Sequence, residues 1–147
     1  AIPERLIQLP KRLFTTTRDY TMNDIERKRQ MNQSKEMARL ACDALEDKKA
    51  IDIKVIDIEK ITTLADYFII TSGSNRSQVQ AMADNVEEFL GKAGYEPKQI
   101  EGYQNANWIL MDYGDIVLHI FDEENRLFYD LERIWRDGTC ISVNELE

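Results

Sequence analysis

The sequence predicts a single α/β domain with a mixed β-sheet of about five strands flanked by helices, in the order α-β-β-α-β-β-β-α. A chain of 147 residues is long enough to bury one substantial core. Short β-branched or apolar runs alternate along it with longer stretches of helical periodicity. A hairpin near residue 114 implies antiparallel neighbours, whereas a strand–helix–strand crossover favours parallel ones. The sheet is therefore expected to be mixed.

The first half of the domain predicts one helix and two strands. Asn32–Lys49 carries a helical apolar stripe, which consists of Met37, Leu40, Ala41, Ala44 and Leu45. Ile51–Ile58 is β-branched and mostly alternating, which favours a strand. Tyr67–Thr71 is apolar on both faces, which is typical of a central strand that is covered on both sides.

The clearest helix follows Asn75, which can cap it, with Gln78 in the capping-box position. Its buried face is expected to comprise Val79, Met82, Ala83, Val86, Phe89, Leu90 and Ala93. Gly94 ends this helix, and a weak strand is expected at 98–102. A final amphipathic helix, ended by Gly138, carries its apolar stripe on Leu127, Phe128, Leu131, Ile134 and Trp135.

Residues Trp108–Phe121 predict two strands joined by a tight turn at Tyr113-Gly114, because Gly accepts the positive φ that a two-residue hairpin needs. If Asp112 pairs with Asp115 across this turn, Trp108 lies opposite His119 on the neighbouring strand. Side chains alternate between the two faces of a strand, so the two faces of the hairpin can be compared directly.

One face of the hairpin is purely aliphatic and is expected to be core; it consists of Ile109, Met111, Ile116, Leu118 and Ile120. The other, here called the mixed face, carries Trp108, Leu110, Asp112, Asp115, Val117, His119 and Phe121. Apolar side chains combined with a Trp, a His and two carboxylates suit a surface that meets a partner. We therefore expect the mixed face to be left unburied by its own domain.

Charge is unevenly distributed along the chain, whose formal net charge is −8. Residues 1–30 carry +3 and the remainder carries −11. Residues 1–30 also contain two prolines and lack an apolar period, so we interpret them as an appended, largely flexible extension before a domain of residues 31–147, with a helix between Asp19 and Arg29 as an open alternative. A domain this acidic repels a phosphate backbone, so direct nucleic-acid contact is not expected as the main interaction. Basic proteins, ribosomal proteins among them, are the favoured partners.

The chain has only two cysteines and one histidine, so neither a metal site nor a cofactor site is expected. Cys42 and Cys140 lie at opposite ends of the domain, and one histidine cannot complete a zinc site with them. We expect two free thiols in a reducing cytosol, and hence a cytoplasmic protein. No apolar run approaches the roughly 20 residues that span a bilayer, so no membrane contact is expected.

An enzymatic alternative remains, in which Ser74 contacts nucleotide phosphates and Asp112 and Asp115 hold a metal ion, as in nucleotidyltransferases. Gly73-Ser74 lies between a strand and a helix, where helix amides can hold an anion. The pattern is too short for a phosphate-binding motif, however, and a tight turn accounts for the glycine without a ligand. No pair of carboxylates one residue apart follows on a strand.

The ring side chains of the domain have both structural and functional interpretations. His119 could act as a general base beside the turn carboxylates, but packing against Trp108, with one ring nitrogen hydrogen-bonded, is the favoured interpretation. Trp108 suits a partner contact as well as packing, because Trp is enriched among interface anchors. Trp135 lies on an apolar helical stripe and is expected to be core.

Six motifs occur in a fixed order between about residues 33 and 138. They are Ala65-Asp-Tyr-Phe-Ile-Ile70, Gly73 with Gln78, Glu101-Gly102, Trp108 followed by Asp112-Tyr-Gly-Asp115, Val117-Leu-His-Ile-Phe121 and Arg126-Leu-Phe-Tyr-Asp-Leu-Glu-Arg-Ile-Trp135. In this order and spacing the chain resembles the ribosomal silencing factor family, also called RsfS or Iojap. Residues 1–30 fall outside the resemblance.

The resemblance implies a nucleotidyltransferase-like fold without that activity, so the protein is expected not to be an enzyme. It implies binding to the large ribosomal subunit through its fourteenth protein, on the face that the small subunit approaches. Joining of the subunits would be blocked and translation repressed when nutrients are scarce. It also implies a homodimer when the protein is free. An assembly factor that dimerises through the mixed face, and contacts the ribosome elsewhere, is a third possibility.

Candidate partner-binding residues follow from the same motifs. On the hairpin they are Trp108, Leu110, Asp112, Asp115, Val117 and His119. Tyr129, Leu131 and Glu132 in the last helix are weaker candidates, because helical periodicity places Leu131 among core residues. The implied mechanism is steric, with affinity from a few anchors in a complementary patch and faster encounter from the negative charge.

Overall fold

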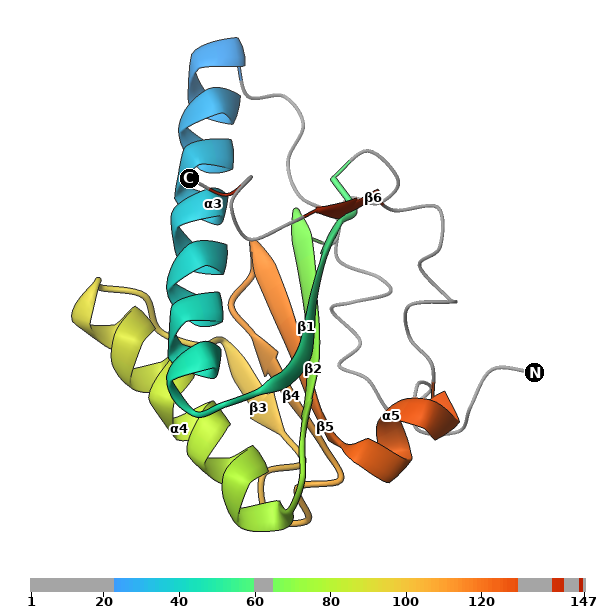
Figure 1. Ribbon diagram of the computed structural model, residues 1–147. Helices are drawn as coiled ribbons and strands as arrows, with labels where there is room; N and C mark the ends of the chain where they lie inside the picture. Colours follow the sequence, from blue (N-terminus) through green and yellow to red (C-terminus); the bar gives the residue numbers. More distant parts are fainter. Residues whose placement is uncertain (1–22, 60–64, 130–138, 142–145, 147) are drawn as a thin grey trace.

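The computed structural model describes residues 23–59, 65–129, 139–141 and 146. Within them, helices flank one six-stranded sheet in the order β3-β4-β5-β2-β1-β6 (Figure 1). The elements in chain order are α3 (Asp24–Asp47), β1 (Ile51–Asp57), β2 (Tyr67–Gly73), α4 (Arg76–Lys92), β3 (Gln99–Glu101), β4 (Trp108–Asp112), β5 (Ile116–Asp122), α5 (Glu123–Tyr129) and β6 (Thr139–Ile141). The predicted order and mixed α/β class are confirmed. The short strand β6 is an addition, because the tail carries no strong strand signal.

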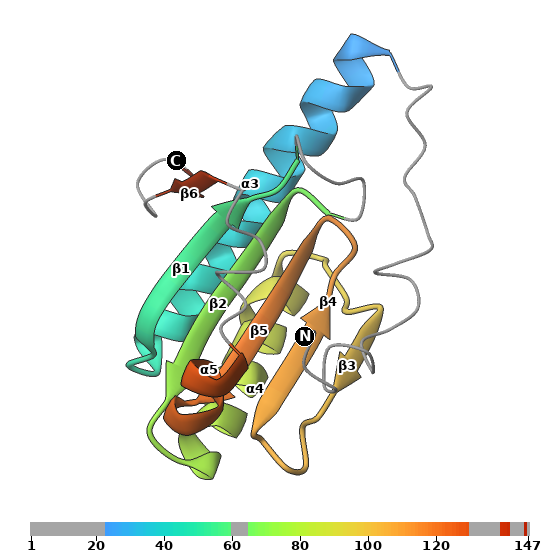
Figure 2. The ribbon, with the colours of Figure 1, turned by 90° about the vertical axis from the view of Figure 1, so that its right-hand side faces the viewer.

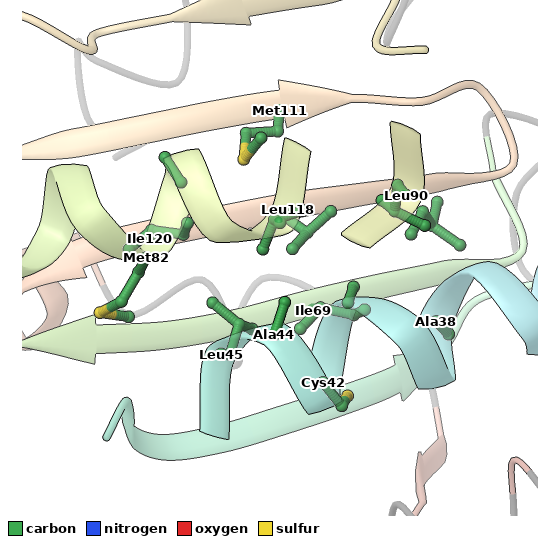
Figure 3. Close-up of a cluster of buried hydrophobic side chains, with 14 of the residues drawn as sticks. Ala38, Cys42, Ala44, Leu45, Ile69, Met82, Leu90, Met111, Leu118 and Ile120 are labelled. Carbon is green, nitrogen blue, oxygen red and sulfur yellow. The ribbon is translucent and has the colours of Figure 1, made fainter. Parts of the chain in front are cut away.

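Helices α3 and α4 lie together on one face of the sheet, whereas α5 lies on the other side, near one end of β5 (Figures 1 and 2). The main core fills the space between the sheet and α3 with α4 (Figure 3). It includes the aliphatic face of the hairpin, which is buried as predicted: Ile109, Met111, Ile116, Leu118 and Ile120. The predicted stripes of α3 and α4 face the same core, except that Ala93 is exposed beyond the end of α4. The side chains of the last predicted stripe, from Leu127 to Trp135, lie outside the described part, so that stripe stays a prediction.

The first helix begins earlier than its apolar stripe predicts. Asn23 caps it by accepting a hydrogen bond from the backbone N–H of Glu26, and α3 runs without a break from Asp24. Arg27 pairs with Glu59, and Gln30 donates to Asp115 across 3.2 Å. The predicted start at Asn32 is therefore wrong, and the helix allowed between Asp19 and Arg29 is present from Asp24. A cap and contacts to distant segments stabilise these turns, whose Ile25 is exposed.

The central strand β2 is parallel to β5 and antiparallel to β1. Helix α4 belongs to the crossover that connects β2 to β5, which explains the parallel pair. Every residue of β2 is buried. The predicted central strand, covered on both faces, is confirmed.

The hairpin has the predicted strands but a different register. Asp112 pairs with Val117 and Leu110 with His119, whereas Trp108 lies opposite Phe121. The predicted register is thus wrong by two residues, and the turn is Gly114-Asp115 with Gly114 at φ +91. The Asp112 carboxylate accepts a hydrogen bond from the Gly114 N–H at 2.8 Å, which favours this turn. A shift of two residues leaves every side chain on its predicted face.

Candidate functional site

The mixed face lies on the side of the sheet opposite α3 and α4. The strands beside the hairpin extend its apolar part, so that one cluster crosses β1, β2, β5 and β4 (Figure 2). The cluster comprises Ile56, Ile58, Ala65, Phe68, Ile70, Trp108, Leu110, Val117 and Phe121. The polar members of the mixed face, Asp112 and His119, are buried on the same two strands.

The mixed face is buried, apart from the half-buried Asp115 at the turn. Trp108 exposes 1 % of its surface, Leu110 2 %, and Val117 and His119 expose none. The expectation that this face is left open is therefore wrong. Reasoning from the hairpin alone missed the apolar side chains that β1 and β2 contribute beside it. Each Å² of such surface removed from water stabilises the fold by about 25 cal/mol.

His119 and Trp108 form a buried polar pair. The indole Nε1–H of Trp108 donates to Nδ1 of His119 at 3.0 Å, although the two residues are not directly paired across the strands. The His119 ring also lies 4.9 Å from the ring centre of Phe68. The favoured interpretation, packing against Trp108 with one ring nitrogen hydrogen-bonded, is confirmed.

The remaining imidazole nitrogen of His119 and the Tyr113 hydroxyl are the two buried side-chain polar atoms without a hydrogen-bond partner among the described residues. Because Nδ1 accepts from Trp108, the proton of the neutral ring belongs on Nε2. Burial lowers the pKa of His119 to about 3, so the ring is neutral at ordinary pH. Nε2 is buried and has no hydrogen-bond partner in the described part of the chain. An unpaired donor of this kind costs about 1–3 kcal/mol.

The two turn carboxylates make structural contacts. Asp112 is fully buried and bonds to the turn backbone, and Asp115 accepts from Gln30 of α3. Beside them, Ser34 donates to the buried carboxylate of Asp66. Sequence reasoning did not predict these α3 contacts, because Gln30 lies in a polar run assigned to the extension and the contacts join residues far apart in the sequence.

The residues of the enzymatic alternative are not brought together. Ser74 follows the last residue of β2, whereas Asp112 and Asp115 lie beside the first residues of β5. Since β2 and β5 are parallel with Tyr67 beside Ile116, these groups lie at opposite ends of the strands, about 20 Å apart.

Close packing accounts for the glycine before α4. The Ser74 N–H donates to the Gln78 side chain at 2.6 Å, and Gln78 also donates to the carbonyls of Lys48 and Lys49. A Cβ on Gly73 would lie 3.0 Å from a methyl group of Val79. The loop amide of Ser74 thus already has a partner within the domain.

The weaker candidates lie at the edge of the described structure. Tyr129 is the last residue of α5, and its side chain is outside the described part. Leu131, Glu132 and Trp135 lie outside the described residues, so their predicted roles stay predictions.

The described residues contain no cluster of metal ligands and one buried free cysteine. Among them, no three His, Cys, Asp or Glu side chains gather as a metal site would require. Cys42 is a buried free thiol whose pKa is raised to about 12, mainly by burial and then by Glu46 and Asp43. None of the described helices has the length and apolar character of a membrane span.

Fold and site together define a mixed α/β domain with a buried Trp–His pair and no assembled catalytic group in its described residues. A family model described as "Ribosomal silencing factor during starvation", RsfS, matches residues 31–147. The chain therefore belongs to the RsfS family, and the resemblance seen in the sequence motifs is confirmed.

Curated relatives and solved structures agree with this assignment. The ribosomal silencing factor RsfS of Bacillus subtilis is 41 % identical over 114 residues, which cover 78 % of this chain and 96 % of that protein. RsfS of Halalkalibacterium halodurans is 36 % identical over 110 residues, which cover 75 % of this chain and 94 % of that protein. A crystal structure of a protein from Chromobacterium violaceum has a TM-score of 0.67 at 37 % identity, covering 73 % of this chain and 88 % of the other.

Proposed function

We propose that this protein binds the large ribosomal subunit and represses translation by preventing the small subunit from joining. Membership of the RsfS family supports a role at the ribosome. The sequence resemblance favours the fourteenth protein of the large subunit as the contact, on the face that the small subunit approaches. Occupying that face is sufficient for repression, so no bond need be made or broken.

We further propose that the contact uses the mixed face and its rim. The observation that carries this is the buried Nε2–H of His119, which has no acceptor in the described part of the chain. Buried polar groups are rarely left unpaired in native proteins. A partner that inserts a carbonyl oxygen here would satisfy the donor and cover Trp108 and Leu110. Since the face is buried in the free chain, it must be uncovered before it binds.

Asp115 is the accessible part of the proposed contact. It lies half-buried at the tip of the hairpin, beside Gln30. A carboxylate at the rim of an interface attracts a basic ribosomal protein and contributes mainly to the rate of encounter. Tyr129, Leu131 and Glu132 remain proposed contributors from the C-terminal side.

Co-sedimentation with purified large subunits tests the contact. We expect Asp115→Lys to reduce binding at least fivefold, because it reverses the charge at the rim. Asp43→Lys makes the same change in net charge on an exposed position of α3, on the other side of the sheet, and should bind as the unchanged protein does. Trp108→Ala is unsuitable, because truncating a buried Trp costs about 3–5 kcal/mol of stability.

The steric mechanism is tested by adding small subunits to the same mixtures. The unchanged protein should lower the fraction of joined ribosomes in proportion to its occupancy of large subunits. Binding without any effect on joining would refute the mechanism. Equal binding by the Asp115→Lys and Asp43→Lys variants would remove the hairpin turn from the contact.

We also propose, from the family resemblance, that the free protein is a cytoplasmic homodimer. Light scattering of the purified protein should then give twice the chain mass of 17.2 kDa. A measured mass equal to that of one chain at micromolar protein concentration would contradict the dimer. A dimer that persists when large subunits are bound would place self-association outside the mixed face.

A further inference from the structure

Helices α3 and α4 cover the side of the sheet opposite the mixed face, and their outer surface faces away from the sheet (Figures 1 and 2). This outer surface, here called the helix face, includes Lys35, Arg39, Leu40, Asp43, Glu46 and Phe89. The helices pack with opposite chain directions, since Asn85 donates to the carbonyl of Ala44 whereas the later Tyr95 donates to the earlier Glu36. The two helices therefore form one layer.

The charges of α3 are separated along its length. Residues 24–39 carry five Lys/Arg against three Asp/Glu, hence +2, whereas residues 40–47 carry three acids and no base, hence −3. Acids in the last turn of a helix oppose the helix dipole. The stability of the isolated helix therefore does not account for this arrangement.

The charged side chains along the middle of α3 are available for contacts. Lys35 and Arg39 are partly exposed beside Leu146, and Asp43 and Glu46 are exposed. None of these four charges makes an ion pair within the part of the chain that the structure describes. Lys35, Arg39 and Asp43 recur every four residues, so they form one stripe in which basic side chains give way to an acidic one.

An apolar hollow lies where the basic part of the helix face meets the acidic part. It has a volume of about 330 Å³ and is lined by Leu40, Phe89, Lys92 and Ala93. Leu40 and Phe89 pack partly buried against the main core. Protein interfaces typically have an apolar centre within a polar rim. The helix face has this layout, with opposite charges on the two sides of its centre.

The layout is complementary to itself. A twofold axis through the hollow places the basic part of each α3 against the acidic part of the other, and hollow against hollow. If the two α3 helices cross antiparallel near residue 41, Arg39 lies opposite the partner's Asp43. Helices of 24 and 17 residues, each about 10–12 Å wide, offer roughly 600–700 Å² of outer surface. This area approaches the about 800 Å² that each partner buries in a standard interface.

We propose that two copies of this chain pair through the helix face, about a twofold axis at the apolar hollow. The pairing rests on the homodimer proposed above and supplies its contact surface. Because the helix face and the mixed face lie on opposite sides of the sheet, the pairing leaves the mixed face and the turn at Asp115 to the ribosomal partner. The dimer would then persist on large subunits.

Charge reversal on each part of the helix face tests the pairing by analytical ultracentrifugation. Lys35→Glu with Arg39→Glu makes the helix face mainly acidic, whereas Asp43→Lys with Glu46→Lys makes it mainly basic. Each variant alone should self-associate at least tenfold more weakly than the unchanged chain, because like charges meet at the contact. An equimolar mixture of the two variants should recover a mass twice the chain mass of 17.2 kDa, because their faces carry opposite charges. Recovery also shows that both variants are folded.

Lys54→Glu with Lys98→Glu is the matched control, because it changes the net charge as the first variant does at exposed positions outside α3 and α4. This control should dimerise as the unchanged chain does. Weakened dimers without recovery in the mixture would overturn the pairing. Equal self-association of both variants and the unchanged chain would also overturn it, and leave the homodimer standing. A monomeric unchanged chain would overturn the pairing and the homodimer together, while co-sedimentation with large subunits decides the proposed repression separately.

Discussion

His119 is the residue in which burial has the clearest chemical consequence. Desolvation lowers its pKa from 6.5 to about 3, and its Nδ1 is occupied by the indole N–H of Trp108. The folded protein therefore holds a neutral imidazole throughout the ordinary pH range. It is the single histidine of the chain, so its titration can be separated from that of other groups.

Stability should fall as the pH is lowered from 7.5 to 5.5. The unfolded chain binds a proton at His119 near pH 6.5, whereas the folded chain does not until about pH 3. The contribution of the neutral ring is thus complete above pH 6.5 and is lost progressively below it. At pH 5.5 the loss amounts to about 1.4 kcal/mol in the free energy of unfolding.

Urea unfolding at the two pH values checks this prediction, with His119→Phe as the comparison. The variant should be less stable at both values, because the indole N–H of Trp108 loses its acceptor. The His119→Phe variant should also lack the loss in free energy of unfolding that His119 causes between pH 7.5 and pH 5.5. The same loss in both proteins would assign the effect to other groups.

At the scale of elements, the junction between β2 and α4 depends on the absence of a side chain at Gly73. A Cβ there would lie 3.0 Å from Val79 Cγ2 and 3.2 Å from Met82 Sδ, both in the buried face of α4. The helix therefore rests directly on the backbone of β2. The sequence indicated a tight turn here, and the structure adds close packing as the reason for glycine.

Gly73→Ala should destabilise the protein by about 1–3 kcal/mol, because the added methyl group forces α4 or its side chains to shift. Gly91→Ala is the matched control on the same helix, since a Cβ at Gly91 meets nothing within 4 Å. That change should stabilise the protein by about 0.5–1 kcal/mol, because alanine favours the helical backbone. Thermal unfolding of both variants measures the difference. A stable Gly73→Ala protein would show that the junction can relax.

The hairpin shows which properties of an element are local. Alternation of side chains along β4 and β5 predicted the two faces correctly. The register was wrong, because the choice of turn depended on the bond between the Asp112 carboxylate and the Gly114 amide. A register shift of two residues leaves each side chain on the same face of the sheet, so the predicted core residues were unaffected.

At the scale of the whole molecule, the net charge of −8 would favour the approach of the proposed basic partner. We expect the association rate with large subunits to fall several-fold between 50 and 200 mM NaCl, because salt screens the attraction between opposite charges. The dissociation rate should change much less. Stopped-flow mixing of a dye-labelled protein with large subunits measures both rates. An association rate independent of salt would exclude electrostatic steering.

Local patterns in the sequence predicted the order of helices and strands apart from β6, the two faces of the hairpin and the family, because caps, periodicities and motifs are carried by neighbouring residues. Tertiary structure alone decided that the mixed face is buried and that Ser74 lies far from Asp112. These properties depend on which distant segments of the chain pack together. Burial of a side chain depends on its neighbours in space, and no local pattern in a strand specifies them.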